Sequence, residues 1–277
     1  MAKTIAASKK DKTTSAPAAD QPVRICFERI LPDDLDSERM VRRRLRQQMI
    51  EAAGGAAKLK ADGVAHVTRM ALVSSKQWPD GTTLRCRFLD GSKKMKAKVK
   101  AIALEWQKYA DVKLKFVSKG DAEIRISFYA DNGSWSAVGR DALNTSYFPV
   151  HQPTMNYGWL RDDTDDQEYH RVVTHEFGHA LGCIHEHQSP KFDRVWDVAA
   201  VMKYFQGPPN YWGPDEIKSN VIDKYSPKGI AATNFDPDSV MLYAFDGALF
   251  ADGKGPTNEN TQLSPTDIQM IGRMYPK

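Results

Sequence analysis

Hydrophobic and polar positions alternate most regularly between residues 78 and 160, where the pattern predicts several short strands and one helix. In the segment TLRCRFL, Leu84, Cys86 and Phe88 alternate with polar residues, as in a strand that buries one face. Residues 93–110 instead place apolar side chains three or four positions apart, which indicates an amphipathic helix. The predicted strands are 83–89, 112–117, 122–128, 135–139 and 154–158.

The order of these elements favours an α+β protein, in which a mixed sheet carries helices. After residue 183 the pattern changes, because Pro, Gly, Asn and Asp become frequent and regular periodicity fades. A last helix is predicted near the C-terminus, where Ser264, Pro265 and Asp267 form a typical helix start. We therefore expect a regular α+β part followed by an irregular part.

The N-terminal region has a different character. Residues 1–22 are rich in Lys, Ser, Thr and Ala and have almost nothing apolar to bury, so we predict a disordered tail. A short apolar segment follows, and a one-sided apolar stripe then predicts a helix at about 36–53. The predicted division is a tail (1–22), an N-terminal extension (23–77) and a main domain (78–277).

The composition is that of a globular protein, since 41% of the 277 residues are hydrophobic and 27% are charged. No run approaches the roughly 18 apolar residues of a membrane-spanning helix. The first 22 residues lack the apolar stretch of a secretory signal, so we expect either export by a non-classical route or a cytoplasmic location. Three cysteines, Cys26, Cys86 and Cys183, cannot all pair, which excludes a disulfide scaffold.

The net charge of +4 is concentrated near the N-terminus. Residues 1–60 hold 13 Lys/Arg and 8 Asp/Glu, whereas residues 61–277 hold 26 and 27 and are nearly neutral. The larger part therefore has no electrostatic support for a nucleic-acid partner. The arginines at 42–44 and 46 are interpreted as a solvated helix face or as a contact with an acidic partner. If they bound DNA instead, that binding would weaken steeply as the salt concentration rises.

Four of the seven histidines lie between positions 175 and 187. On a helix, residues four apart lie one above the other, so His175 and His179 can direct both imidazoles at one ion. Gly182 tolerates the positive φ of a sharp turn, which can return His185 as a third ligand. Three neutral nitrogens and one position open to solvent are typical of a catalytic zinc ion, with Glu176 placed to accept a proton from water.

This arrangement is specific. The composition gives a chance expectation on the order of 10⁻⁵ for three such histidines with the Glu and the Gly at these spacings. The alternative is a helix whose histidines are ordinary core or surface residues.

An acidic loop, residues 161–168, precedes the histidine segment. Asp165 and Glu168 have the spacing of a capping box, and acidic side chains suit the positive end of a helix. A calcium site is the alternative, although the ligand spacing of a known calcium loop is missing.

The segment HEFGHALGCIH resembles the H-E-x-x-H-x-x-G-x-x-H signature of the metzincin metallopeptidases, and HEHQSP from His185 onward resembles their astacin-like branch. Downstream, DPDSVMLYAF is similar to the astacin turn Ser-x-Met-His-Tyr, with Met241 beneath the metal and Tyr243 two residues on. The resemblance implies that Tyr243 can bind zinc as a fifth ligand and stabilise an oxyanion.

The resemblance also implies a fold. A mixed, mostly parallel twisted sheet with an antiparallel edge strand, backing helices and the active-site helix would form an upper subdomain (78–182), and the irregular lower subdomain (183–277) would complete a cleft. The segment GSWSAVG (133–139) resembles the edge strand that pairs with an extended peptide, although Trp135 can instead be a core anchor.

The sequence departs from the family at three points. Leu242 stands where astacins usually carry His, and three cysteines cannot supply the two disulfides usual in astacins. Cys183 lies inside the zinc loop, where it is either a metal-binding thiolate or, as we favour, a small buried packing residue. His187 is expected near the site or at the surface, and His66, His151 and His170 carry no motif.

Many metzincins are kept latent by a prosegment that places a Cys or Asp on the zinc. Cys26, Asp33 and Asp34 are candidates, but none lies in a recognisable switch motif. Residues 23–77 are therefore either an inhibitory prosegment or a structural extension packed on the main domain.

The sequence predicts a zinc-dependent metalloendopeptidase acting on proteins or peptides. His175, His179 and His185 would bind one Zn²⁺, Glu176 would move protons and Tyr243 would assist. The alternative is a catalytically weak zinc-binding toxin or interaction module on the same scaffold.

Overall fold

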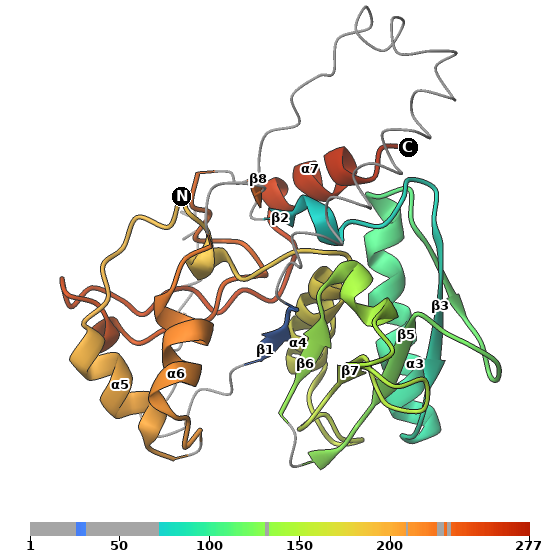
Figure 1. Ribbon diagram of the computed structural model, residues 1–277, viewed down its shortest axis with the longest axis horizontal. Helices are drawn as coiled ribbons and strands as arrows, with labels where there is room; N and C mark the ends of the chain where they lie inside the picture. The colour runs from blue at the N-terminus through green and yellow to red at the C-terminus, as the bar shows by residue number, and fades with distance from the viewer. Residues whose placement is uncertain (1–25, 32–71, 131–132, 209, 226–229, 232–233) are drawn as a thin grey trace, which may run out of the picture.

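The computed structural model describes residues 26–31, 72–130, 133–208, 210–225, 230–231 and 234–277 (Figure 1). Its larger sheet has six strands in the order β1-β6-β7-β5-β3-β4, and a second sheet pairs β2 with β8. The strands are β1 (Phe27–Arg29), β2 (Leu72–Val73), β3 (Thr83–Phe88), β4 (Lys113–Phe116), β5 (Ile124–Ser127), β6 (Trp135–Ala137), β7 (Met155–Asn156) and β8 (Ile230–Ala231).

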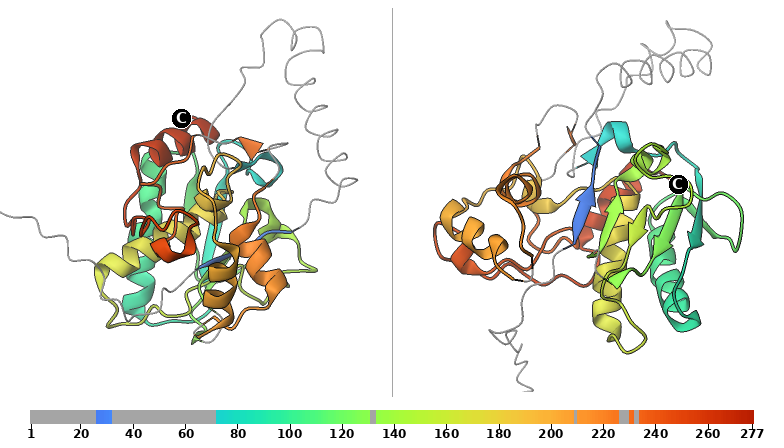
Figure 2. Two further views of the ribbon diagram at one scale, coloured as in Figure 1. Left: turned by 90° about the vertical axis from the view of Figure 1, so that its left-hand side faces the viewer. Right: turned by 60° about the horizontal axis from the view of Figure 1, so that its bottom comes forward.

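The larger sheet is mixed and mostly parallel. Strands β3, β4, β5 and β7 run parallel to one another, whereas β6 pairs antiparallel with β7. This confirms the predicted α+β class with an antiparallel strand next to parallel ones. Strand β6 is not at the edge, because β1 pairs with it in parallel (Figure 2).

Helices α3 (Lys93–Ala103) and α4 (Asp166–Ala180) pack against each other, and α4 also contacts β6 (Figure 1). Helix α3 begins after Ser92, whose hydroxyl accepts the Met95 N–H, and it buries Met95, Val99 and Ala103 on one face. The α-helix ends at residue 103, earlier than predicted. A 3₁₀ segment, η2 (Leu104–Lys108), continues it, and the buried Trp106 donates its indole N–H to Thr174 on α4.

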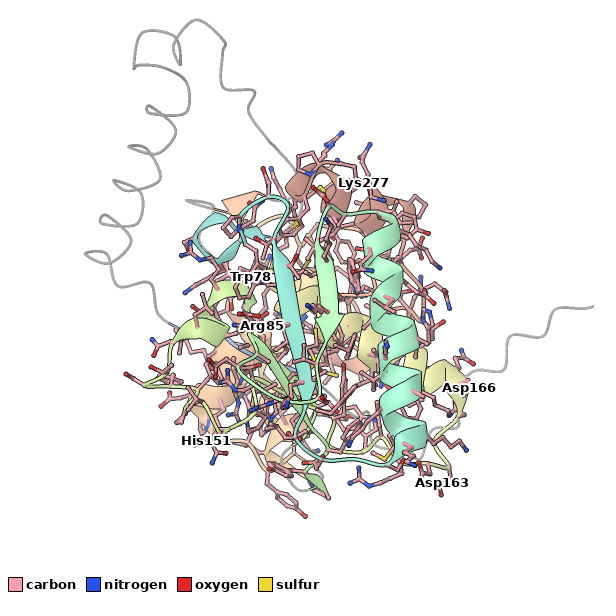
Figure 3. The ribbon with its side chains drawn as sticks, turned by 90° about the vertical axis from the view of Figure 1, so that its right-hand side faces the viewer. Trp78, Arg85, His151, Asp163, Asp166 and Lys277 are labelled. Atoms are coloured by element: carbon pink, nitrogen blue, oxygen red, sulfur yellow. The ribbon has the colours of Figure 1, made fainter. Side chains whose placement is uncertain are left out.

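The acidic loop caps α4. The Asp165 side chain accepts the Glu168 N–H at 2.8 Å, as predicted. The second bond of a capping box is not made, because the Glu168 carboxylate instead accepts from the Trp159 indole and from Arg171. Figure 3 shows Asp163 and Asp166 at this end of the helix layer. Among the described residues, no group of three acidic side chains converges here as metal ligands.

The C-terminal part contains α5 (Val198–Gln206), α6 (Pro214–Ile217) and α7 (Pro265–Met274), with long irregular connections. The predicted start of α7 is confirmed, since Ser264 and Asp267 form a reciprocal capping box. Buried aromatic side chains such as Phe192, Phe245 and Phe250 fill this part. Within the described ranges, no helix is both long and apolar enough to cross a bilayer.

Several N-terminal predictions lie outside the described residues. These are the tail 1–22, the helix 36–53, the arginines at 42–44 and 46, and Asp33, Asp34 and His66. Of the extension 23–77, the structure describes residues 26–31 and 72–77, including the 3₁₀ turn η1 (Ser74–Lys76).

Candidate zinc site

Helix α4 carries the first two predicted ligands and then stops abruptly. Gly182 has φ +100°, as the sequence predicts, and its N–H bonds to the His179 carbonyl at 2.8 Å. The Cys183 N–H bonds to the Gly178 carbonyl at 3.0 Å, so the chain reverses directly after the helix. This turn returns His185 to the side chains of His175 and His179.

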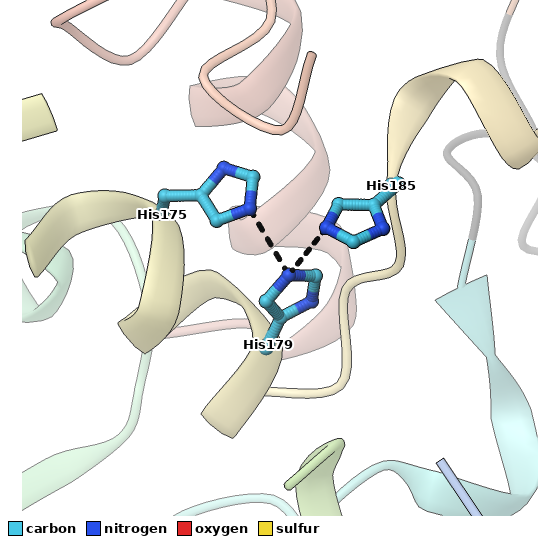
Figure 4. Close-up of side chains that lie close together, drawn as sticks. All are labelled: His175, His179 and His185. Atoms are coloured by element: carbon cyan, nitrogen blue, oxygen red, sulfur yellow. Dashed lines mark hydrogen bonds between the residues drawn. The ribbon is translucent and has the colours of Figure 1, made fainter. Parts of the chain in front are cut away.

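The three imidazoles converge (Figure 4). The His179 Nε2 atom lies 3.1 Å from the Nε2 atoms of both His175 and His185. The Nδ1 atom of each imidazole lies near an oxygen that can only accept a hydrogen bond. Each Nδ1 therefore carries a hydrogen and donates it. The acceptors are the Val240 carbonyl for His175, the Cys183 carbonyl for His179 and the Gln188 amide oxygen for His185.

These outer hydrogen bonds leave three Nε2 lone pairs directed at one point. Burial lowers the pKa of His179 to about 4 and holds the pKa values of His175 and His185 well below their usual range, so the rings are neutral. Neutral imidazoles with lone pairs 3.1 Å apart repel unless a cation lies between them. Three such nitrogens with an open fourth position fit a catalytic zinc ion.

Glu176 lies beside the triad and is fully buried. Neither of its carboxylate oxygens has a hydrogen-bond partner of normal geometry in the described part of the chain. Burial raises the pKa of this carboxyl, while the Cys26 thiol and the Arg171 guanidinium oppose the rise. A buried, unsatisfied carboxylate is costly, so its presence beside the three imidazoles points to a chemical rather than a packing role.

Tyr243 approaches the triad from the predicted Met-containing turn. Its hydroxyl contacts the His185 Nε2 atom, and its ring stacks on His175 with centroids 5.3 Å apart. The same hydroxyl donates to the main-chain carbonyl of Cys26. The structure thus brings together His175, His179, His185, Glu176 and Tyr243, the full set of site residues predicted from the sequence.

Met241 lies beneath α4, the helix that carries the first two predicted zinc ligands, as the family resemblance implies. A Cβ atom at Gly178 would lie 2.5 Å from its Sδ atom, so Gly178 allows the turn to approach the helix between the two histidines. This role could not be predicted from the sequence, because Gly178 occupies a variable position of the zinc motif.

The segment around β1 also reaches the site, which the sequence could only suggest through Cys26. The Cys26 thiol is buried, and burial together with the Glu176 charge raises its pKa well above the usual range. The Cys26 main chain accepts from Tyr243. Of the three candidate switch residues, Cys26 is therefore within the site, and Asp33 and Asp34 lie outside the described residues.

Glu28 is a further residue that the sequence analysis missed. Its carboxylate accepts from the Tyr225 hydroxyl and from the His185 main-chain N–H at 3.3 Å. It lies 3.5 Å from His179 Nδ1 and 3.7 Å from His185 Nδ1. Burial raises the pKa of the Glu28 carboxyl to about 7. No local pattern could have found it, because its partners lie more than 150 positions away in the chain.

The remaining candidates lie apart from the ligand set. Cys183 is buried and unpaired, and it contributes its carbonyl rather than its thiol to the site, in agreement with a packing role. His187 is buried beside His185 and bonds to the Asn220 carbonyl at 3.1 Å. His170 bonds to Glu105 and Thr261, and His151 is exposed on a loop, visible in Figure 3.

The mixed sheet, the helix with two histidines and the returning third histidine define a metzincin-type zinc peptidase. The chain belongs to the astacin family, since the family model described as Astacin, a peptidase family, matches residues 72–276. The family implies a catalytic zinc ion, and the three histidines are positioned to bind it. The chain is thus a member of a peptidase family.

Individual relatives agree with this assignment. The chain is 39% identical to myroilysin in a structure that aligns with a TM-score of 0.72, covering 75% of this chain and 98% of that chain. It is 24% identical to protein SpAN of Strongylocentrotus purpuratus over 54% of this chain, and 24% identical to bone morphogenetic protein 1 of Xenopus laevis over 72%. The matches span only 22% and 27% of the lengths of these two curated relatives.

Proposed function

We propose that the protein hydrolyses internal peptide bonds of proteins or peptides, with His175, His179 and His185 as the zinc ligands and Glu176 as the group that moves protons. The observation that carries the proposal is the convergence of three neutral Nε2 atoms beside a buried, unsatisfied carboxylate. A zinc ion bound there supplies Lewis acidity, which polarises a carbonyl and favours ionisation of water near neutral pH.

The protein residues then perform the proton transfers. Glu176 accepts a proton from the attacking water and delivers it to the leaving amine. Its burial suits both roles, because a raised pKa lets the carboxyl hold a proton between the two steps. The Tyr243 hydroxyl already contacts His185 Nε2. From there it donates a hydrogen bond to the carbonyl oxygen of the substrate, which gains negative charge in the reaction.

Strand β6 indicates which class of substrate the site accepts. Here β6 pairs along Trp135–Ala137 with an extended segment of the chain itself, and main-chain pairing of this kind accepts almost any side-chain sequence. Trp135 is itself buried, stacks on Phe148 and lies under Arg29. Its side chain therefore anchors the core, while its main chain takes part in the strand pairing with β1.

A substitution of Glu176 separates catalysis from metal binding. In the trimmed Glu176→Gln variant we expect stoichiometric zinc and casein hydrolysis at least about 10²-fold slower than in the trimmed wild type, because general-base catalysis typically contributes that factor. Wild-type hydrolysis should also stop with 1,10-phenanthroline. Unchanged hydrolysis in the variant would refute the mechanism, and would leave the fold assignment intact. A wild-type protein that binds zinc without hydrolysing peptides, even after trimming, would favour the alternative of a non-catalytic zinc-binding module.

We further propose that the segment 26–31 keeps the enzyme latent. It pairs with the strand that would hold substrate, and Cys26 occupies the space beside Glu176 and Tyr243. Limited proteolysis between residues 32 and 71, followed by removal of the released fragment, should raise the hydrolytic rate. Mass spectrometry verifies that residues 26–31 have left. No gain after verified removal would favour the structural-extension alternative.

A further inference from the structure

We infer that Lys76 and Asp141 form a main-chain clamp that holds residue 31, and with it the segment 26–31, against the catalytic domain. The inference rests on the proposed latency of this segment and names the contact that governs its release. Two charged side chains from different elements, η1 and η4 (Gly139–Leu143), meet at one residue of the segment.

The clamp binds both polar main-chain groups of Leu31. Its N–H donates to Asp141 Oδ2 at 2.8 Å, and its carbonyl accepts from Lys76 Nζ at 3.0 Å. Lys76 Nζ also bonds to Asp141 Oδ1 at 2.8 Å, which joins the two sides into one unit. Because both bonds to Leu31 are made to its main-chain atoms, they hold an extended backbone and do not depend on the Leu31 side chain.

The geometry of the catalytic domain builds this clamp. Gly139 has φ +49°, and a Cβ atom there would lie 2.0 Å from the Lys76 carbonyl oxygen. It would also lie 3.3 Å from Cα of Gly182, in the turn that follows the zinc helix. The close packing of η1 on η4 thus places the ion pair at a fixed position relative to the zinc site.

The clamp lies where the strand pairing stops. The ladder between β1 and β6 ends at Arg29 and Ala137, and one further bond joins the Val138 N–H to the Arg29 carbonyl at 3.3 Å. Two residues later the clamp holds Leu31. The segment is therefore fixed at one end by the Tyr243 contact with Cys26 and at the other end by charged side chains.

The ion pair also provides a route to release. The predicted extension ended at residue 77, but Lys76 lies on η1, which packs on η4 of the catalytic domain. Lys76 and Asp141 bond to each other, so the segment can leave without separating them. Water then replaces the Leu31 N–H and carbonyl. Within the buried environment of the bound state, both side chains are less than a tenth exposed, so these charge-assisted bonds are stronger than ordinary surface contacts.

The three cysteines provide a test that needs no peptidase activity. Cys26 lies in the segment, whereas Cys86 and Cys183 are fully buried in the catalytic domain and report on its folding. Alkylation of the full-length, zinc-loaded protein is followed for each cysteine by peptide mass spectrometry. The rate at Cys26 measures how often the segment opens.

We expect the Lys76→Met variant to label Cys26 at least about tenfold faster than the wild type, since loss of a charge-assisted hydrogen bond typically costs about that factor. The Lys76→Met/Asp141→Leu variant removes both charges of the ion pair together and should behave in the same way. Labelling of Cys86 and Cys183 should stay at the wild-type rate in both.

A matched control is Lys98→Met. Lys98 Nζ also bonds to one carboxylate and one main-chain carbonyl, those of Asp166 and Thr164, but on the helix layer behind the sheet. It should leave Cys26 labelling unchanged. An unchanged Cys26 rate in the Lys76 variants, or equal acceleration at all three cysteines, would overturn the clamp. Failure of the proposed peptidase appears instead in the hydrolysis assay, so the two outcomes are distinguishable.

Discussion

The contact between Gly178 and Met241 makes a quantitative prediction about how the zinc helix is supported. A Cβ atom at residue 178 would lie 2.5 Å from Met241 Sδ, 3.3 Å from its Cε and 3.4 Å from Cζ2 of Trp106. All three residues are in the interior, so the Met241 side chain must move into a packed environment.

Two effects oppose each other in the Gly178→Ala variant. Overpacking a core typically costs about 1–3 kcal/mol. Replacing Gly by Ala inside a helix typically gains about 1 kcal/mol. We therefore expect a net loss of about 1 kcal/mol in the free energy of unfolding, which corresponds to a fall in Tm of about 2–4 °C for a domain of this size.

A double-mutant cycle with Met241→Ala isolates the contact. In the Met241→Ala background the added methyl has room, so Gly178→Ala should stabilise by about 1 kcal/mol instead of destabilising. The measurement is denaturant unfolding of the four zinc-loaded proteins, followed by circular dichroism. Additive effects of the two substitutions would refute the argument that Met241 requires a glycine at this position of the helix.

Two other predictions concern the site. Tyr243→Phe should lower kcat for casein or a peptide by about 10²–10³-fold in the trimmed enzyme, because removal of one oxyanion donor has that typical effect, and zinc content measured by atomic absorption should stay stoichiometric. Full activity of this variant would exclude the hydroxyl from the reaction. Removal of zinc should lower Tm, since a ligand at about 1,000 times its Kd stabilises the folded state by about 4 kcal/mol, and calorimetry with and without a chelator measures this. An identical Tm in both samples would contradict a metal bound by the three imidazoles.

Local sequence patterns were sufficient for most strands of the larger sheet and for the zinc motif, but not for α5 and α6, which lie in the part predicted to be irregular. Alternation located β3, β4 and β5 within a few residues, and β6 and β7 were predicted as shorter strands at 135–139 and 154–158. The zinc motif could also be recognised in the sequence. Helix α4 and the turn at Gly182 fix the relative positions of His175, His179 and His185 within eleven residues.

Contacts between distant parts of the chain could not be read in this way. The pairing of β1 with β6 joins Phe27 to Trp135. The hydrophobic pattern of neither segment indicates which strand it pairs with. The Gly178 contact with Met241 likewise depends on how closely two elements approach in space. Helix α3 was predicted too long because its apolar spacing continues to Trp106, and 3₁₀ geometry keeps that residue buried beyond residue 103.

The strand β1 has a consequence for solubility. Once residues 26–31 depart, the main-chain donors and acceptors of Trp135–Ala137 lose their partner and become an open template for strands of other molecules. A newly made chain that still carries β1 is protected, while it folds, from aggregation through this edge of β6. If the proposed latency holds, the trimmed enzyme gains a place for substrates and, by the same change, a tendency to associate with copies of itself at high concentration.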